Sequence, residues 1–231
     1  MKNAIRLTVA ASILALGGCA TAPQQPIAFH QDAFNKGQPS KIGVVMTPIP
    51  KVDTYLPGAG CLLCYAAAAA ANSTLNSYSH TLPVEDLPNL KKQVADVLVK
   101  RGLDAVVIDE PLDVKKLPRA HAEGPNLARQ DFTALKAKYH VDKLLVIDVE
   151  LLGFVRTYAS YIPTSDPKAE FNGLGYIVDL NTNAFDWYNP VSIVKSSDGQ
   201  WKEPPKFPGL TNAYFQTLEL GKDGFVKPLA Q

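Results

Sequence analysis

The sequence has few of the residues from which metal and redox centres are built, and neither charge is in excess. Cysteine occurs three times and histidine four times in 231 residues, so no second cysteine pair or closely spaced histidines complete the four ligands of a structural zinc site. The 23 Lys and Arg residues nearly balance the 22 Asp and Glu residues, unlike the basic excess of nucleic-acid-binding proteins. The glycine spacing contains no phosphate-binding loop. We therefore expect no cofactor, no metal site and no nucleic-acid partner.

The N-terminal apolar run is shorter than the roughly 20 residues that a membrane-spanning helix requires. It covers residues 7–16, follows Lys2 and Arg6, and ends in small residues. These are the parts of a secretory signal. The stretch "LGGC", ending at Cys19, resembles the lipobox of bacterial lipoproteins, in which the signal is removed before the cysteine and the cysteine is acylated. The resemblance implies a signal peptide over 1–18 and a lipid-bearing Cys19.

The residues after Cys19 predict how the protein is held. Ala20 stands where the resemblance leads us to expect an aspartate for retention in the inner membrane, so we predict an outer-membrane lipid anchor with the protein facing the periplasm. The stretch 20–39 is polar and contains proline and glutamine, a composition typical of linkers. We therefore divide the chain into the acylated cysteine with a flexible tether over 19–40 and a periplasmic domain over 41–231.

From Lys41 onward the hydrophobic periodicities predict alternating strands and helices. Strands are expected at 42–46, 103–108, 143–152 and 154–162, a hairpin at 175–180 and 185–194, and helices at 86–101, 127–140 and 210–220. The strand at 103–108 is apolar on both faces, which favours a central position in the sheet. This order predicts an α/β fold in which helices pack on a mixed sheet.

The same order of elements resembles a group of periplasmic lipoproteins. The stretches "KIGVV", "DLPNLKKQVADVLVKRGLDAVVI", "LKAKYHVDKLLVIDVELLGF" and "GLGYIVDLNTNAFDWY" carry the resemblance. It is to lipoproteins whose domain is like the N-terminal domain of TolB, including the curli secretion lipoprotein and the lipoprotein activators of penicillin-binding proteins. The resemblance implies a compact α/β sandwich. Those proteins reach their first helix sooner, so the stretch 51–83 is an apolar insert of this chain, which we expect to be surplus to the core.

The insert contains the cysteine pair Cys61 and Cys64. With Cys19 acylated, these two are an even pair in an oxidising compartment, which favours a disulfide between them. A redox centre, a metal site and two reduced buried thiols are the alternatives. A redox centre needs its first cysteine exposed at a helix N-terminus directly after a strand. Prolines separate Cys61 from the only strand that the sequence predicts before it, which disfavours that alternative.

The alanine-rich stretch 62–71 after the first of these cysteines favours a helix that is apolar on every side. Such a helix is normally buried or lies in an interface. Three environments remain open: its own domain, a docking surface for an envelope protein or a second copy of the chain, or the membrane, as in the curli secretion channel. Leu62, Leu63, Tyr65 and Ala68 are the candidate docking residues.

The sequence favours binding over catalysis. Asp148 and Glu150 share one face of an expected strand, the spacing of paired catalytic carboxylates, but the wet face of a strand is the commoner reason for such a pair. We predict a non-enzymatic outer-membrane lipoprotein that is an assembly or accessory component of a cell-envelope complex. The alternatives are a periplasmic thiol-redox protein using Cys61 and Cys64, and a membrane-inserting subunit of a secretion channel.

Overall fold

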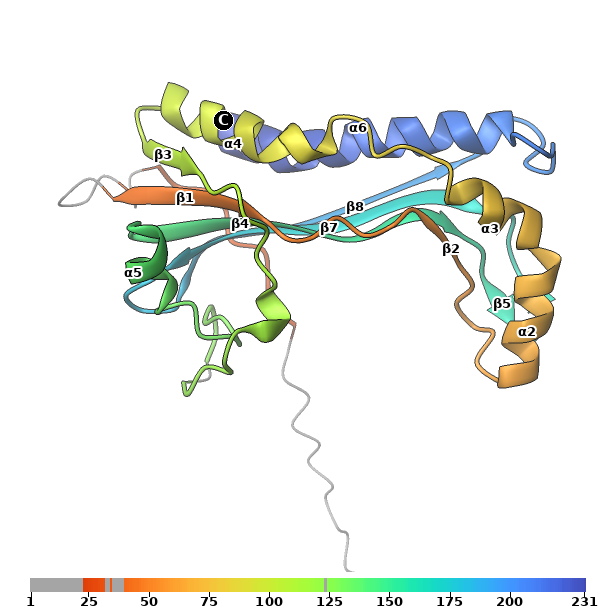
Figure 1. Ribbon diagram of the computed structural model, residues 1–231, viewed down its shortest axis with the longest axis horizontal. Coiled ribbons are helices and arrows are strands. Elements are labelled where there is room, and N and C mark those ends of the chain that lie inside the picture. The colour runs from red at the N-terminus through yellow and green to blue at the C-terminus, as the bar shows by residue number, and fades with distance from the viewer. Residues whose placement is uncertain (1–22, 32–33, 35–39, 123) are drawn as a thin grey trace, which may run out of the picture.

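The computed structural model (Figure 1) describes residues 23–31, 34, 40–122 and 124–231. These residues form a mixed sheet with helices packed against it, which confirms the predicted α/β fold. The strands are β1 (Lys41–Met46), β2 (Asp53–Tyr55), β3 (Asp104–Val107), β4 (Lys143–Val155), β7 (Lys168–Asp179) and β8 (Phe185–Ser196), with a separate pair β5 (Tyr158–Ala159) and β6 (Ile162–Pro163). The helices are α2 (Leu62–Ala71), α3 (Ser73–Ser79), α4 (Leu90–Lys100), α5 (Leu135–Tyr139) and α6 (Pro208–Ala230).

The sheet is built around β4, its longest strand. The strand order is β3-β1-β4-β7-β8, with β1 parallel to β3 and β4, and with β7 antiparallel to β4 and β8. The short strand β2 extends the β1 side by pairing in parallel with the last residues of β4. As a result β4 runs from the end of the sheet where the β7–β8 hairpin turns to the end where the insert lies.

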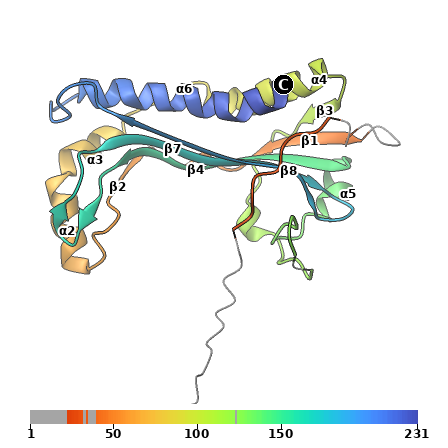
Figure 2. The ribbon, with the colours of Figure 1, turned by 180° about the vertical axis from the view of Figure 1, so that it is seen from behind.

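Helices α4 and α6 lie side by side on one face of the sheet (Figures 1 and 2). On α4 the buried positions Leu90, Val94 and Leu98 recur every four residues, which places them on one side of the helix. On α6 large side chains such as Tyr214 and Phe225 are fully buried against the sheet. The side chains between this face and the two helices form the main hydrophobic core. The helical spacing of the buried residues on α4 is the signal that predicted this helix.

The opposite face of the sheet is covered over only part of its length. A second core forms there between the sheet, α5 and the connection before α5, around Phe132 and Tyr176. Burial raises the pKa of Tyr176 well above its ordinary value. Farther along β4, β7 and β8, this face carries the exposed polar residues Glu150 and Ser192 and the partly exposed Glu170, and Figure 1 shows no helix across it.

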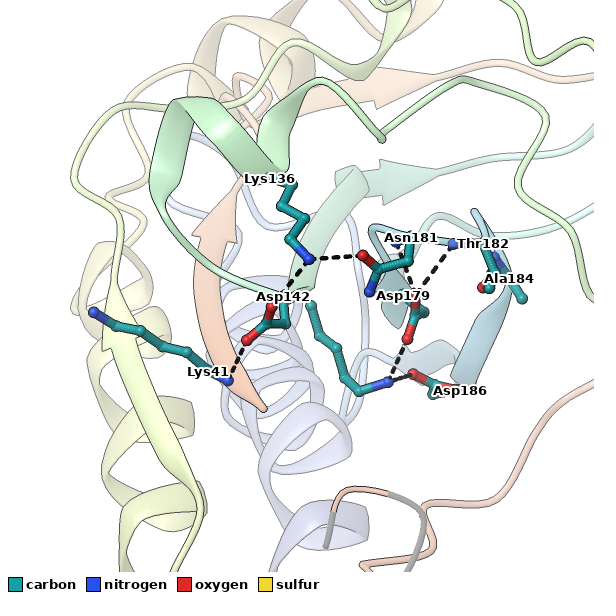
Figure 3. Close-up of polar contacts among 9 residues, drawn as sticks. Lys41, Lys136, Asp142, Asp179, Asn181, Thr182, Ala184 and Asp186 are labelled. Carbon is teal, nitrogen blue, oxygen red and sulfur yellow. Dashed lines mark hydrogen bonds and ion pairs between the residues drawn. The ribbon is translucent and has the colours of Figure 1, made fainter. Parts of the chain in front are cut away.

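A polar network holds the end of the sheet where β4 begins and the β7–β8 hairpin turns. Lys143, almost fully buried, places its Nζ 2.8 Å from Asp179 and 2.7 Å from Asp186. Asp179 also accepts hydrogen bonds from the backbone of Asn181 and Thr182 in the turn (Figure 3). Burial disfavours the Lys143 charge, but the two carboxylates outweigh that cost and raise its pKa.

Two of the predicted secondary-structure elements are wrong, and the strand predicted at 103–108 forms at a different place in the sheet. Strand β3 is at an edge, because it pairs only with β1. The helix expected at 127–140 is reduced to α5, since Asn183 of the hairpin turn bonds the backbone of residues 128, 130 and 132 and holds this stretch extended. The strand expected at 154–162 is divided between the end of β4 and the β5–β6 pair.

The tether prediction is also wrong for the residues that the structure describes. Ile27 forms an antiparallel bridge with Tyr188 on β8, with N to O distances of 2.8 and 3.1 Å. Phe34 is buried in the main core, and Phe29 stacks on it. The domain therefore includes residues before Lys41.

The insert is not surplus to the core, contrary to the prediction. Its strand β2 pairs with β4 over Asp53 to Tyr55. Val52, Leu75 and Leu82 belong to the main core. Sequence reasoning missed β2 because a strand of three residues is too short for an alternating pattern to be recognised.

Candidate functional site: an apolar tip

Within the insert, the cysteine pair lies at the N-terminus of α2. Cys61 is the N-cap of α2, and Cys61 and Cys64 form a disulfide with Cα atoms 4.9 Å apart. The Sγ atom of Cys61 accepts a hydrogen bond from the Cys64 backbone N–H at 2.9 Å, which satisfies one of the free donors at the helix start. Cys61 is exposed, and Cys64 is buried.

One side of α2 packs against the β5–β6 pair. Cys64 and Ala68 form a small apolar cluster with Ala59 and Tyr158. Ala68 is only 1% exposed, so its predicted place among the docking residues is wrong. Because the buried side chains of α2 are small, the helix approaches its neighbour closely, and its larger apolar residues are left on the other side.

Hydrogen bonds fix the position of α2 relative to the sheet. Asn72 Nδ2 donates to the Tyr158 hydroxyl at 2.6 Å and to the Ala68 carbonyl at 2.7 Å, and its Oδ1 accepts from Arg156 at 3.1 Å. Gly58 has a positive φ of 89°, and a Cβ atom there would lie 1.9 Å from the Tyr158 carbonyl oxygen. The contact therefore requires glycine at this position, and it ties the start of the insert to β5.

The helix α2 and the β5–β6 segment that pack together here carry exposed apolar side chains. Leu62 is 86% exposed, Leu63 81%, Tyr65 55%, Tyr161 65% and Ile162 57%. They are five of the nine exposed large apolar residues in the described part of the chain, and they come from two adjacent segments. We call these five residues the apolar tip.

No charged side chain interrupts either segment of the apolar tip. The stretches 56–79 and 157–165 contain no Asp, Glu, Lys or Arg. Monomeric proteins seldom leave contiguous apolar surface in water, and such patches mark sites of contact with proteins or membranes. The tip is thus the surface of the described chain that is best suited to binding.

Sequence reasoning found Leu62, Leu63 and Tyr65 of the apolar tip and missed Tyr161 and Ile162. These two residues lay within the strand predicted at 154–162 and were not singled out. The absence of charge over 157–165 was a signal that could have identified them. Tyr158, which supports the tip from beneath, was not distinguishable from the exposed Tyr161 in the sequence.

The cysteine pair has a geometry that the sequence disfavoured. Cys61 is exposed at the start of α2, Cys64 is buried one turn later, and β2 ends six residues before Cys61 in the sequence. An accessible first cysteine at a helix N-terminus is common in redox-active pairs. The stretch before the pair does contain a strand, β2, but Pro57 still separates it from Cys61, so the pair does not directly follow a strand.

The other candidate residues do not form a comparable site. Asp148 accepts a hydrogen bond from the Thr47 hydroxyl at 2.8 Å, and Glu150 lies at a bulge of β4. Burial, together with the charge of Asp148, raises the pKa of Glu150. Among the described residues, no group of three or more His, Cys, Asp or Glu side chains is placed to hold a metal ion. Cys19 lies outside the described residues.

Over residues 23–231, apart from the gaps given above, no helix is both long enough and apolar enough to cross a bilayer. The ten-residue helix α2 has a length of about 15 Å, roughly half the thickness of the hydrocarbon core. Any contact of the apolar tip with lipid is therefore a contact at the membrane surface.

The comparisons with known proteins find weak structural likeness only. No family model and no curated protein matches the sequence. A PelC L103M dodecamer from Paraburkholderia phytofirmans is 9% identical, with 83% of this chain and 88% of that chain covered and a TM-score of 0.36. Lipoprotein GNA1162 from Neisseria meningitidis is 14% identical, with 79% and 99% covered and a TM-score of 0.28. Protein XCC0632 from Xanthomonas campestris is 14% identical, with 81% and 85% covered and a TM-score of 0.36. Each likeness is too weak to assign a function.

Proposed function

We propose that this protein is a lipoprotein anchored to the outer membrane through Cys19, and that it is a non-enzymatic accessory or assembly component of a cell-envelope complex. The domain faces the periplasm and acts by contact with another envelope component. The lipobox-like "LGGC" supports the anchor, because it places a cysteine directly after a secretory signal.

The observation that supports action by contact is the apolar tip. Leu62 and Leu63 are among its most exposed residues, yet the backbone that carries them is held by the Cys61–Cys64 disulfide and by the bonds of Asn72. A pre-ordered apolar surface loses little conformational freedom on binding, which favours affinity. Exposed leucines in a loose loop would not have this property.

Two measurements in cells test this proposal. Replacement of Cys19 by alanine should move the protein from the membrane fraction to the soluble periplasmic fraction; a variant that remains in the membrane fraction contradicts the anchor. The combined change Leu62→Ser, Leu63→Ser and Tyr161→Ser should abolish the protein's contribution to envelope integrity, measured as resistance to detergents. Val99→Ser is the matched control, because Val99 is 53% exposed on α4, away from the tip. Equal resistance in the tip variant and the control contradicts action through the tip.

A second candidate function is thiol-disulfide exchange, and the placement of the cysteine pair favours it. The exposed position of Cys61 at the start of α2 leaves its sulfur open to attack by a thiol. In this case Cys61→Ser should abolish exchange with oxidised glutathione, while in Cys64→Ser the Cys61 thiolate attacks oxidised glutathione, releases one glutathione thiolate and keeps the other as a mixed disulfide, detectable by intact mass. A disulfide that resists millimolar glutathione would leave the pair with a structural role alone.

A further inference from the structure

The position of Pro23, the first residue that the structure describes, limits how far the domain can be from its lipid anchor. Gln24 Nε2 donates to Asn126 Oδ1 at 2.8 Å, and Ile27 pairs with Tyr188. The description begins at Pro23, so four peptide steps separate this residue from Cys19. Four fully extended residues span about 14 Å at most. If Cys19 is acylated, as the proposed function states, the bilayer surface lies within about 14 Å of Pro23.

The apolar tip lies on the side of the sheet from which the chain begins. In Figures 1 and 2, the segment 23–31 passes β8 and reaches the side of the sheet opposite α4 and α6. The insert helix α2 and strand β5 project from the same side, and both views agree. A bilayer close to Pro23 on this side therefore faces the apolar tip, and helices α4 and α6 point away from it.

The chemistry of the tip suits the interface between lipid headgroups and acyl chains. Leucine and isoleucine partition into the apolar layer, whereas tyrosine prefers the boundary, where its ring is apolar and its hydroxyl is hydrated. The tip contains both kinds of residue, and no charge in either of its segments opposes their insertion. The length of α2 suits a contact at this depth, because a helix of ten residues is too short to cross the bilayer.

A second element on this side of the sheet has a net positive charge, which is complementary to anionic lipid headgroups. The connection over 113–129 contains four Lys or Arg residues and two Asp or Glu residues, a net charge of +2. Its Lys115 and Lys116 are exposed. Basic residues at a membrane surface are attracted by anionic headgroups. The sheet between the two elements carries Glu150 and Glu170, so this part of the domain stays out of the apolar layer.

We propose that the apolar tip inserts into the surface of the bilayer that holds Cys19, with the connection 113–129 resting on its headgroups. The lipid and the tip then hold the domain at two points and set its orientation, with α4 and α6 directed into the periplasm. The envelope component that the tip contacts under the proposed function is then the bilayer itself, because the short link to Cys19 leaves little room for a protein between the domain and the bilayer. The inference rests on the lipid anchor of the proposed function.

Tryptophan fluorescence tests the position of the tip. The acylated full-length protein is reconstituted into phosphatidylethanolamine and phosphatidylglycerol vesicles with brominated acyl chains, which quench tryptophans that enter the bilayer. Leu63→Trp places a tryptophan on the tip, and Val99→Trp is the matched control on α4, where the side chain is 53% exposed. We expect strong quenching of the first and none of the second, after subtraction of the parent signal. Equal quenching of the two variants overturns the proposal.

A measurement without the anchor separates this proposal from the proposed function. The mature chain from residue 19, without the signal and with Cys19→Ser, is mixed with the same vesicles, and its partition is compared with that of a chain that also carries Leu62→Ser and Leu63→Ser. Loss of two inserted leucines should lower the partition coefficient at least roughly tenfold. Equal partition overturns the membrane contact even if Cys19 is acylated in cells. Crosslinking of Leu63 to a protein and not to lipid in intact cells would overturn it as well.

Discussion

Helices α2 and α6 are both rich in apolar residues and have opposite environments. Of the ten residues of α2 only Cys64 and Ala68 are buried, whereas α6 buries nine of its 23 residues, among them Leu210, Tyr214 and Phe225. The difference is in which side chains face the domain. Helix α6 turns its large residues inward, and α2 turns small ones inward and leaves Leu62 and Leu63 in solvent. Apolar content alone therefore does not determine burial.

The comparison separates two uses of the hydrophobic effect. Around α6, burial of large side chains stabilises the fold by roughly 1.5 to 3 kcal/mol for each fully buried residue. At the apolar tip, the same free energy is not released on folding and remains available for binding. Mutations at the two places should therefore affect different properties.

Truncation under α6 should have the largest effect on stability. Phe171 is fully buried and packs edge to face on Phe225 of α6. We expect Phe171→Ala to lower the free energy of unfolding by about 3 to 5 kcal/mol, measured by urea denaturation. Leu63→Ala at the tip should change it by less than about 0.5 kcal/mol, because the side chain is exposed in the free protein. A similar loss in both variants would contradict the distinction between α2 and α6.

The two sides of α2 should respond differently to the same enlargement. Ala68 is buried against Tyr158, whereas Ala67 is exposed. We expect Ala68→Leu to destabilise the protein by about 1 to 3 kcal/mol, because the added carbons have no space beneath the helix. Ala67→Leu is the control and should leave the unfolding midpoint unchanged. Tolerance of leucine at both positions would show that α2 is not packed as described.

Removal of the disulfide should loosen the tip without unfolding the core. The change Cys61→Ser with Cys64→Ser releases a ring of four residues, for which loop entropy predicts a loss of about 2 kcal/mol. The loss should appear as faster amide hydrogen exchange in α2, while the amides of α4 keep their protection. Faster exchange in both helices would mean that the tip and the core unfold together.

A fall in pH should lower stability mainly through the end of the sheet opposite the apolar tip, where Lys143 pairs with Asp179 and Asp186. Burial opposes ionisation of Asp179, but Lys143 and the turn amides outweigh it and lower its pKa. Its contribution to stability is complete above the ordinary aspartate pKa of about 3.9 and is lost as the pH falls through the lower folded value. Asp179→Asn should therefore flatten the decline of stability below about pH 4. Leu63→Ala should leave that decline unchanged; if Asp179→Asn does so too, the network is not the cause.

The sequence predicted the elements whose signals are local. The apolar spacing of α4 and the alternation of β7 and β8 are properties of the residues themselves, and these elements formed as expected. The two strands and α6 are longer than predicted, because pairing and packing extend them beyond their most regular stretches. The extended stretch 126–132 was not predictable, since it depends on the side chain of Asn183 about fifty residues later.

For the apolar tip, the sequence by itself determined that the segment is apolar and uncharged. The tertiary structure determined which of its side chains are buried and which are exposed. The cysteine spacing, the alanines and the absence of charge over 56–79 are visible in the chain. A helix without a polar face has no preferred side, so its periodicity could not tell which residues are buried. Only the contacts of Tyr158 with Ala68 and Asn72 decided that Ala68 faces inward and Leu63 outward. These contacts join residues some ninety positions apart, and pairing of distant residues is information that only the folded chain contains.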